Sequence, residues 1–289
     1  MSEINERALE RLENLNHIEP LLASLRILSL STLQMAQNRI VNLNAYKNEY
    51  ERALAKFLTL LPEETTEKLL HPQKDGEITE LVVLGSERGI CGKYNKNLAA
   101  MVKEWVDGQP AEYQIFAFGA RLRDALKQAG MSFQFHGSLS QGSKPYFEKA
   151  SEFISARLQA FKEGTITALY VLSYKRISGS ATKPVLSSLI PAEVHISKEE
   201  QSDWPPTLIE GDARSLAERT LEHLTVIHFY DLILESISAE NTIRYNLLEE
   251  AKENVKEMVE ALSIEIQIMK RQKVTQEIQE IAAGAGLTR

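Results

Sequence analysis

Long stretches at the two ends of the chain carry apolar residues at helical spacing. Residues 6–61 contain no glycine and a single proline, Pro20, so nothing after Pro20 interrupts a helix. Residues 212–283 contain neither glycine nor proline. In both stretches apolar side chains recur three or four positions apart, with a mean step of about 3.6 residues. The pattern predicts two long helices, each with one apolar face.

Helices of this length need a partner, because a long helix is stable in water only when its apolar face is covered. At about 1.5 Å per residue, ~50 to 70 residues would extend roughly 75 to 105 Å. Each terminal helix offers the other a matching stripe. We therefore predict an antiparallel pair with weak supercoiling, formed by a first helix within 1–62 and a second within 212–289.

The middle of the chain has a different pattern, in which short apolar runs alternate with helical spacing. Pro62 and an acidic linker up to Gly76 separate it from the first helix. This alternation is typical of a largely parallel sheet covered on both faces. It predicts a Rossmann-like α/β domain at 77–204, inserted between the terminal helices. We expect strands at 81–84, 113–118, 132–135, 165–174 and 185–190, and helices at 94–106, 120–128 and 146–161.

Composition narrows the classes of function. The net charge of -7 argues against broad nucleic-acid binding, which needs a strong basic field. The one cysteine, Cys91, cannot form a disulfide within the chain, and the acidic first residues lack the pattern of a secretory signal. No stretch approaches the ~20 consecutive apolar residues of a membrane span. We expect an intracellular protein that reaches a membrane only through a partner.

The glycine-rich turn at 85–93 follows an expected strand and precedes an expected helix, where a phosphate-binding loop would lie. Its spacing does not fit that loop, because six residues separate Gly85 from Gly92 and Tyr94 follows Lys93. A structural turn is therefore favoured over nucleotide binding. Cys91 is expected to be a packed small residue. The histidines show no metal-ligand spacing, so neither a metal nor a cofactor is predicted.

A basic cluster of Lys270, Arg271 and Lys273 lies near the end of the second expected helix. A run of charges on a helix is usually a solvated face. Here, however, Val274, Ile278 and Ile281 begin a new apolar stripe, and small apolar residues follow at 282–287, where polar residues are expected at a chain end. This combination favours a tip that fits into a socket on a partner.

Two segments resemble the gamma subunit of F-type rotary ATP synthases. Residues 86–95, SERGICGKYN, resemble the family's pattern of Ser/Thr, acid, base, Gly, Leu, Cys/Ala, Gly, any, apolar, Asn. Residues 274–285, VTQEIQEIAAGA, resemble its closing segment. The similarity covers the whole chain, since four further residues match ones that are habitual in the family: Gln37, Arg39, Arg244 and Asn254.

The chain departs from the family pattern at polar positions. Lys270 and Arg271 occupy the places of an Arg-Gln pair, with Gln272 one position late. Residues 31–33 read STL where Ser-Lys-Met is usual, and residues 266–267 read IQ in place of Tyr-Asn. These differences affect the expected polar contacts of a rotor and are consistent with a divergent branch or a paralogue.

The resemblance implies a non-catalytic central-stalk rotor that couples ion flow to conformational change in its partners. The implied partners are the alpha and beta subunits of a catalytic hexamer, an epsilon subunit and a membrane c-ring, at the cytoplasmic face of the cell membrane. It implies no cofactor. It places hexamer contacts at Arg244, Lys270, Arg271, Gln272, Thr275, Ile278, Ile281 and Leu287, c-ring contacts at Thr207, Leu208, Ile209 and Glu210, and a structural motif at Arg88, Gly89, Cys91, Gly92 and Asn95.

Two other classes of function stay open. A coiled-coil scaffold would explain both apolar stripes, but it would not explain the small apolar terminus. A nucleotide-binding α/β enzyme would explain the inserted domain, but it would need the phosphate loop that the spacing at 85–93 does not provide.

Overall fold

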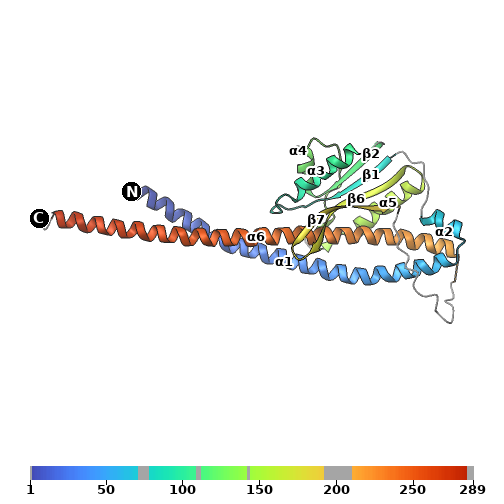
Figure 1. Cartoon of the computed structure of the whole chain (residues 1–289), viewed down its shortest axis with the longest axis horizontal. Helices are drawn as coiled ribbons and strands as arrows, with labels where there is room; N and C mark the ends of the chain where they lie inside the picture. Colours follow the sequence, from blue (N-terminus) through green and yellow to red (C-terminus); the bar gives the residue numbers. More distant parts are fainter. Residues whose placement is uncertain (1, 71–77, 109–111, 142–143, 192–209, 285–289) are drawn as a thin grey trace. The chain divides into compact units, whose positions relative to one another are not determined.

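The computed structural model describes residues 2–70, 78–108, 112–141, 144–191 and 210–284. Two helices of great length begin and end this part of the chain, α1 (Ser2–Thr59) and α6 (Ala213–Gly284). The fold divides into two compact units: one combines 1–29 with 245–289, and the other is 30–244. Both long helices therefore contribute to both units (Figure 1).

The 30–244 unit is built on a five-stranded sheet in the order β3-β2-β1-β6-β7. Four strands are parallel, and β7 runs antiparallel to β6 at one edge. In the register, Leu81 of β1 lies opposite Ile115 of β2 and Tyr170 of β6. The Rossmann-like, largely parallel sheet predicted from the sequence is confirmed. The strands are β1 (Ile78–Leu84), β2 (Glu112–Phe118), β3 (Gln134–Phe135), β6 (Ile166–Ser178) and β7 (Ala181–Ile190).

Helices cover both faces of this sheet. Successive residues of one strand point to opposite faces, so they pack against different helices. On one face, Leu81 and Val83 pack with α3 (Tyr94–Asp107) and α4 (Ala120–Gln128). On the other, Val82 and Leu84 pack with α5 (Phe147–Lys162) and α6. Figure 1 shows α3 and α4 on one side of the strands and α6 on the other. The apolar stripe of α6 is thus partly a sheet-facing surface.

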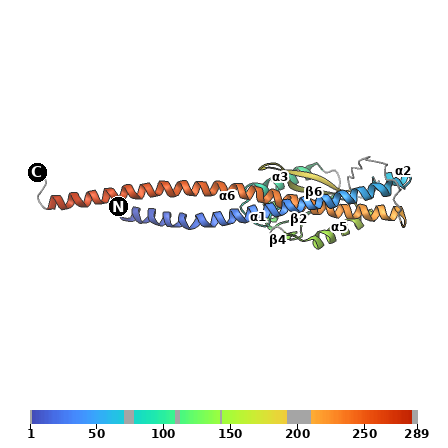
Figure 2. The same ribbon diagram turned by 90° about the horizontal axis from the view of Figure 1, so that it is seen from below.

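Within the 30–244 unit, α1 and α6 run antiparallel (Figure 2). Lys47 lies 3.7 Å from Asp231, and one turn further along α1 the Glu51 carboxylate lies 3.7 Å from His228, one turn back along α6. An apolar cluster that includes Leu54 and Leu224 fills the space between the helices. The seam therefore combines apolar packing with charged pairs.

Within the other unit, α1 and α6 are again antiparallel partners. Arg26 pairs with Glu249 at 2.8 Å, and an open groove of about 450 Å³ has Leu15 on one side and Leu262 on the other. Ile266 is the last fully buried residue of α6. Beyond it, the side chains of 267–283 are exposed except for the half-buried Met269 and Ala282. The end of α6 thus presents its surface to solvent.

Three local expectations were wrong or incomplete. The acidic linker after Pro62 is a short helix, α2 (Glu63–Leu70). The amides of Thr65 and Thr66 donate to the Pro62 carbonyl, and the acidic first turn suits a helix N-terminus. The third strand is shorter than expected, and a small hairpin of β4 (Ser140–Gln141) and β5 (Lys144–Pro145) was not predicted. The fifth strand begins earlier than expected because it extends a hairpin with β6. The loop expected after β7 is largely outside the described residues.

Candidate functional site: the loop after β1 and the end of α6

The loop between β1 and α3 is closed by its own polar side chains. Asn95, in the first turn of α3, reaches back so that its Oδ1 accepts from the Ser86 amide at 3.0 Å and its Nδ2 donates to the Ser86 hydroxyl at 2.8 Å. The Ser86 hydroxyl in turn donates to the Arg88 carbonyl at 3.0 Å. Both residues are buried. The motif residues thus stabilise the shape of the loop itself.

The loop after β1 also contacts the next helix of the sheet through a carboxylate. Glu87 Oε2 accepts a hydrogen bond of 3.0 Å from the amide of Ala120, at the N-terminus of α4. Gly85 and Gly119 allow close packing between the loops: a Cβ on Gly119, where φ is +103°, would lie 2.6 Å from the Gly85 carbonyl oxygen. This geometry is that of a structural turn.

Cys91 lies inside the loop and is 4% exposed. Burial raises the pKa of its thiol, while the hydrogen bond with Ser86 acts in the opposite direction. A buried, protonated thiol is a poor nucleophile. Among the described residues, no group of three or more His, Cys, Asp or Glu side chains could hold a metal ion.

The loop is tied to α6 by two sets of hydrogen bonds. The hydroxyls of Tyr94 and Ser236 lie 2.8 Å apart in the core. Arg244 donates from Nε to the Gly89 carbonyl at 3.2 Å and from Nη1 to Asn241 Oδ1 at 2.9 Å, and its Nη2 pairs with the Glu240 carboxylate. Arg244 is only 5% exposed. The resemblance implies a hexamer contact at Arg244; in this chain its guanidinium is engaged by three groups of the chain itself.

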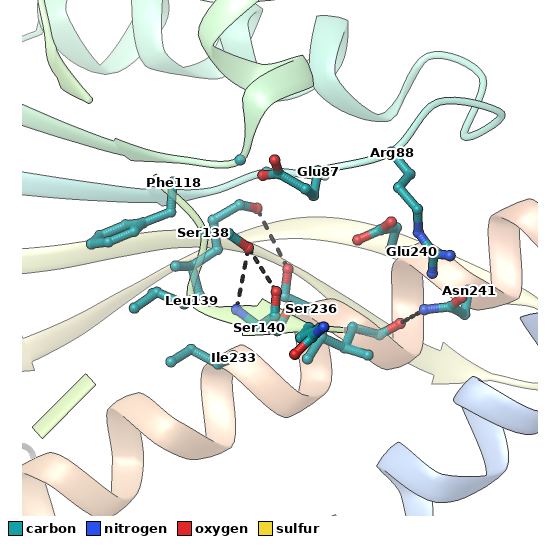
Figure 3. Close-up of a pocket in the computed structure, with 15 residues that line it drawn as sticks. Glu87, Arg88, Phe118, Ser138, Leu139, Ser140, Ile233, Ser236, Glu240 and Asn241 are labelled. Carbon is teal, nitrogen blue, oxygen red and sulfur yellow. Dashed lines mark hydrogen bonds between the residues drawn. The ribbon is translucent and has the colours of Figure 1, made fainter. Parts of the chain in front are cut away.

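A cavity of about 320 Å³ lies beside this junction, at the carboxyl ends of β1 and β2 (Figure 3). It is bounded by the loop after β1, the segment before β4 and one face of α6. Much of its polar lining is satisfied internally: Ser138 Oγ donates to the Ser140 carbonyl, and Asn241 donates to the Ile237 carbonyl. Burial raises the pKa of Glu240, and Arg244 opposes that shift. The lining groups are Leu84, Gly85, Glu87, Arg88, Phe118, Gly119, Ser138, Leu139, Ser140, Gln141, Ile233, Ser236, Ile237, Glu240 and Asn241.

The predicted hexamer contacts near the end of α6 are exposed. Lys270, Arg271, Gln272 and Thr275 are all exposed, and Thr275 Oγ1 bonds to the Arg271 carbonyl at 2.9 Å within the helix. Three apolar side chains fall within about 60° of each other around the helix at 100° per residue. They are strongly exposed: Val274 at 53%, Ile278 at 60% and Ile281 at 71%. Leu287 is outside the described residues.

The predicted c-ring contacts are mostly beyond the described part of the chain. Thr207, Leu208 and Ile209 lie outside it, and Glu210 is an exposed residue just before α6. The residues that sequence reasoning missed are those of α6 that bond to Tyr94 and Arg244: Ser236, Glu240 and Asn241. The spacing of Glu240 and Arg244, four apart on an expected helix, was the available signal for their pairing.

The fold defines a class of protein in which two long terminal helices pair and an α/β domain is inserted between them. A family model described as ATP synthase matches residues 6–286. The chain therefore belongs to the gamma-subunit family of ATP synthases, as its motifs predicted.

Relatives and solved structures agree over nearly the whole chain. The ATP synthase gamma chain of Desulfitobacterium hafniense is 22% identical over 275 residues, covering 95% of each chain. That of Cupriavidus metallidurans is 24% identical over 286 residues, covering 95% of this chain and 96% of the relative. In structure, the chain resembles one from the Euglena gracilis mitochondrial ATP synthase (OSCP/F1/c-ring, rotational state 3), with a TM-score of 0.64, 12% identity, and 99% and 95% coverage. In the described part of the chain no helix is long and apolar enough to cross a membrane.

Proposed function

We propose that this chain is the shaft that couples ion flow through a membrane ring to conformational change at catalytic sites on partner subunits. The observation that carries the proposal is the exposed end of α6, where an apolar stripe of Val274, Ile278 and Ile281 adjoins the basic residues Lys270 and Arg271. Contiguous exposed apolar side chains of this kind mark a surface that a partner covers.

The proposed partners at this end are the alpha and beta subunits of a catalytic hexamer. An asymmetric helix end in a ring of similar subunits contacts each subunit differently, so one angle of the shaft stabilises a different conformation at each site. Ile278, Ile281 and Leu287 would lie in an apolar bearing. Exposed Lys270 and Arg271 would make polar contacts that are individually weak, on the order of 1 kcal/mol or less, so that the shaft can turn.

Arg244 has a different role in this proposal from the exposed residues at the end of α6. Because its guanidinium is bound to Gly89, Asn241 and Glu240, it would have to give up hydrogen bonds of its own chain to contact the hexamer directly. We therefore assign Arg244 to the junction between α6 and the α/β domain, through which torque would pass.

The other proposed contacts connect the shaft to the membrane. Glu210, with Thr207, Leu208 and Ile209, would rest on the c-ring, and an epsilon subunit would join the same rotating assembly. The chain would then be peripheral, held at the cytoplasmic face of the membrane by its partners. In this role it catalyses nothing itself.

Assembly of this chain with alpha and beta subunits tests the proposal. The chain, co-expressed with alpha and beta subunits, should co-purify with an ATP-hydrolysing hexamer, while deletion of 282–289 should weaken that association and leave the α/β domain folded. A full-length chain that folds but never associates would contradict the proposal. Tight ATP binding by the isolated chain, measured by titration calorimetry, would favour the α/β enzyme instead.

A further inference from the structure

A cluster of three aromatic side chains lies on the seam between α1 and α6, outside the site described above. The hydroxyl oxygens of Tyr46 and Tyr50 lie 2.9 Å apart, and the Tyr46 oxygen is 3.0 Å from Nε2 of His223. All three residues belong to the 30–244 unit. Tyr46 is 45% exposed, whereas Tyr50 packs on the apolar cluster between the helices. The fold therefore holds the cluster in place and leaves it open to solvent at Tyr46.

The two phenol rings converge at their hydroxyl ends. Tyr46 and Tyr50 are four positions apart on α1, so they share one face of the helix. Their ring centroids are 4.7 Å apart, while their hydroxyl oxygens are only 2.9 Å apart. Because the oxygens are closer than the centroids, the ring carbons next to the hydroxyls lie near each other. These ortho carbons carry much of the unpaired electron of a phenoxyl radical, so they are the positions at which two oxidised phenols join.

His223 supplies a proton acceptor for the exposed phenol. Loss of one electron makes a phenol strongly acidic, so oxidation is easier when a base already accepts its hydrogen bond. The Tyr46 hydroxyl donates to Nε2 of His223 when that nitrogen carries no proton. The hydrogen bond with Tyr50 raises the pKa of Tyr46 above its ordinary value of 10.0. Tyr46 therefore keeps its proton at neutral pH, and its oxidation must move that proton to an acceptor.

Other tyrosines of the described part of the chain differ in exposure or in neighbours. Tyr94 and Tyr174 also have their rings in contact, with centroids 4.3 Å apart, but they are only 2% and 3% exposed. Tyr113 is 40% exposed, and its ring neighbour is Trp105, with centroids 5.9 Å apart. Tyr113 has neither a phenol nor an imidazole in contact among the described residues. It is therefore an internal reference for the oxidation of an accessible tyrosine without such partners.

We propose that Tyr46 and Tyr50 are a site of oxidative modification, where one-electron oxidants such as nitrogen dioxide or carbonate radicals join the two rings into a dityrosine cross-link. His223 accepts the first proton. This inference does not depend on the proposed function, because the three side chains belong to this chain alone and their contacts form without a partner.

The cross-link forms by loss of one electron and one proton from each phenol. One oxidant takes an electron from Tyr46, whose hydroxyl proton passes to Nε2 of His223 and from there to water. A second oxidant takes an electron from Tyr50, whose proton also passes to water. The two phenoxyl radicals join through one ortho carbon each, and the hydrogen on each of these carbons moves to the oxygen and restores the hydroxyl. Two oxidant molecules are each reduced by one electron, and the product is lighter by two hydrogen atoms.

Oxidation of the isolated full chain tests the proposal. Photogenerated tris(bipyridine)ruthenium(III) serves as the one-electron oxidant, and monomers are separated by size before cross-links are located by dityrosine fluorescence and peptide mass spectrometry. Tyr50→Phe removes one hydroxyl and keeps the ring. His223→Gln keeps a hydrogen-bonding side chain that does not take up a proton. Tyr113→Phe is the matched control, because Tyr113 is about as exposed as Tyr46. Thermal melting by circular dichroism verifies that each variant is folded.

We expect the wild-type monomer to form a cross-link between Tyr46 and Tyr50, and Tyr113→Phe to form it at the same rate. Tyr50→Phe should form no dityrosine within the monomer. His223→Gln should slow the loss of Tyr46 about tenfold or more, because a positioned base contributes at least that factor to a step that moves a proton. Oxidation of Tyr113 in the same molecule should be unchanged, which a general loss of structure would not give.

A wild-type monomer in which Tyr113 is oxidised but Tyr46 and Tyr50 are not joined would overturn the proposal. Dityrosine that links only different molecules would overturn it as well. An undiminished loss of Tyr46 in a folded His223→Gln chain would contradict the part assigned to His223. Cross-linking in a chain that never associates with alpha and beta subunits would support this inference and count against the proposed function alone.

Discussion

Replacing Arg244 by alanine tests the junction between α6 and the loop after β1. The substitution removes donors to the Gly89 carbonyl and to Asn241. It also leaves the Glu240 carboxylate, whose side chain is only 14% exposed, without its ion-pair partner. Breaking a buried ion pair by removing one partner costs about 3 to 5 kcal/mol. We expect Arg244→Ala to lower the free energy of unfolding by that amount at neutral pH.

The loss of unfolding free energy in Arg244→Ala should depend on pH in a defined direction. Burial raises the pKa of Glu240 above its ordinary value of 4.5, and Arg244 opposes that shift, so the pKa rises further in the variant. A carboxyl whose pKa is raised in the folded state stabilises the fold below its unfolded pKa and loses that contribution as pH rises through the folded pKa. The cost of Arg244→Ala should therefore be smaller in acid, where Glu240 is protonated, than at pH 7.

Urea unfolding followed by circular dichroism and by tryptophan fluorescence measures these effects. Adding Glu240→Gln to Arg244→Ala should recover part of the loss, with a coupling energy of about 1 to 3 kcal/mol. Arg214→Ala is the matched control, because Arg214 and Glu218 form an exposed pair at four-residue spacing on the same helix and should contribute less than about 1 kcal/mol. Equal losses of unfolding free energy in acid and at pH 7, without recovery by Glu240→Gln, would refute the reasoning.

Three further changes have separate expected outcomes. Gly119→Ala should destabilise the α/β domain by about 3 kcal/mol or more, because its Cβ would meet the Gly85 carbonyl and φ is positive; a melting temperature equal to wild type would contradict this. Lys270→Ala with Arg271→Ala should lower coupled ATP hydrolysis and ion pumping together without loss of helicity, and normal coupled activity in reconstituted vesicles would remove both residues from the mechanism. Glu210→Lys should weaken attachment to the c-ring, whereas unchanged ion-driven synthesis would show that Glu210 makes no such contact.

The long helices and the sheet could be predicted because their signals are local. The absence of glycine and proline from 212–283 and the alternation of strands and helices follow directly from the order of residues. The short α2 was missed because Pro62 was interpreted as a breaker, although proline is also favoured just at the start of a helix.

The orientation of Arg244 could not be predicted, because its environment is set by residues far away in the sequence. Helical spacing shows which residues share a face, but not that the carbonyl of Gly89, 155 positions earlier, meets that face. Similarly, the loop motif was recognisable as a pattern, whereas the positive φ of Ile90 and the capping of α4 by Glu87 depend on how two loops approach each other. The exposed stripe at 274–281, by contrast, could be predicted from the sequence. Local helical spacing puts its apolar residues on one face, and no partner helix covers that face.

The central claim is that this chain rotates within a ring of catalytic subunits, and single-molecule observation tests it most directly. The ring would be fixed to a surface through its catalytic subunits, and a bead attached to Ser180→Cys in the exposed turn between β6 and β7; Cys91 is buried and should not react. With ATP, we predict stepwise rotation in one direction. A labelled chain that stays fixed in the assembled ring while ATP is hydrolysed at the full rate would contradict the account.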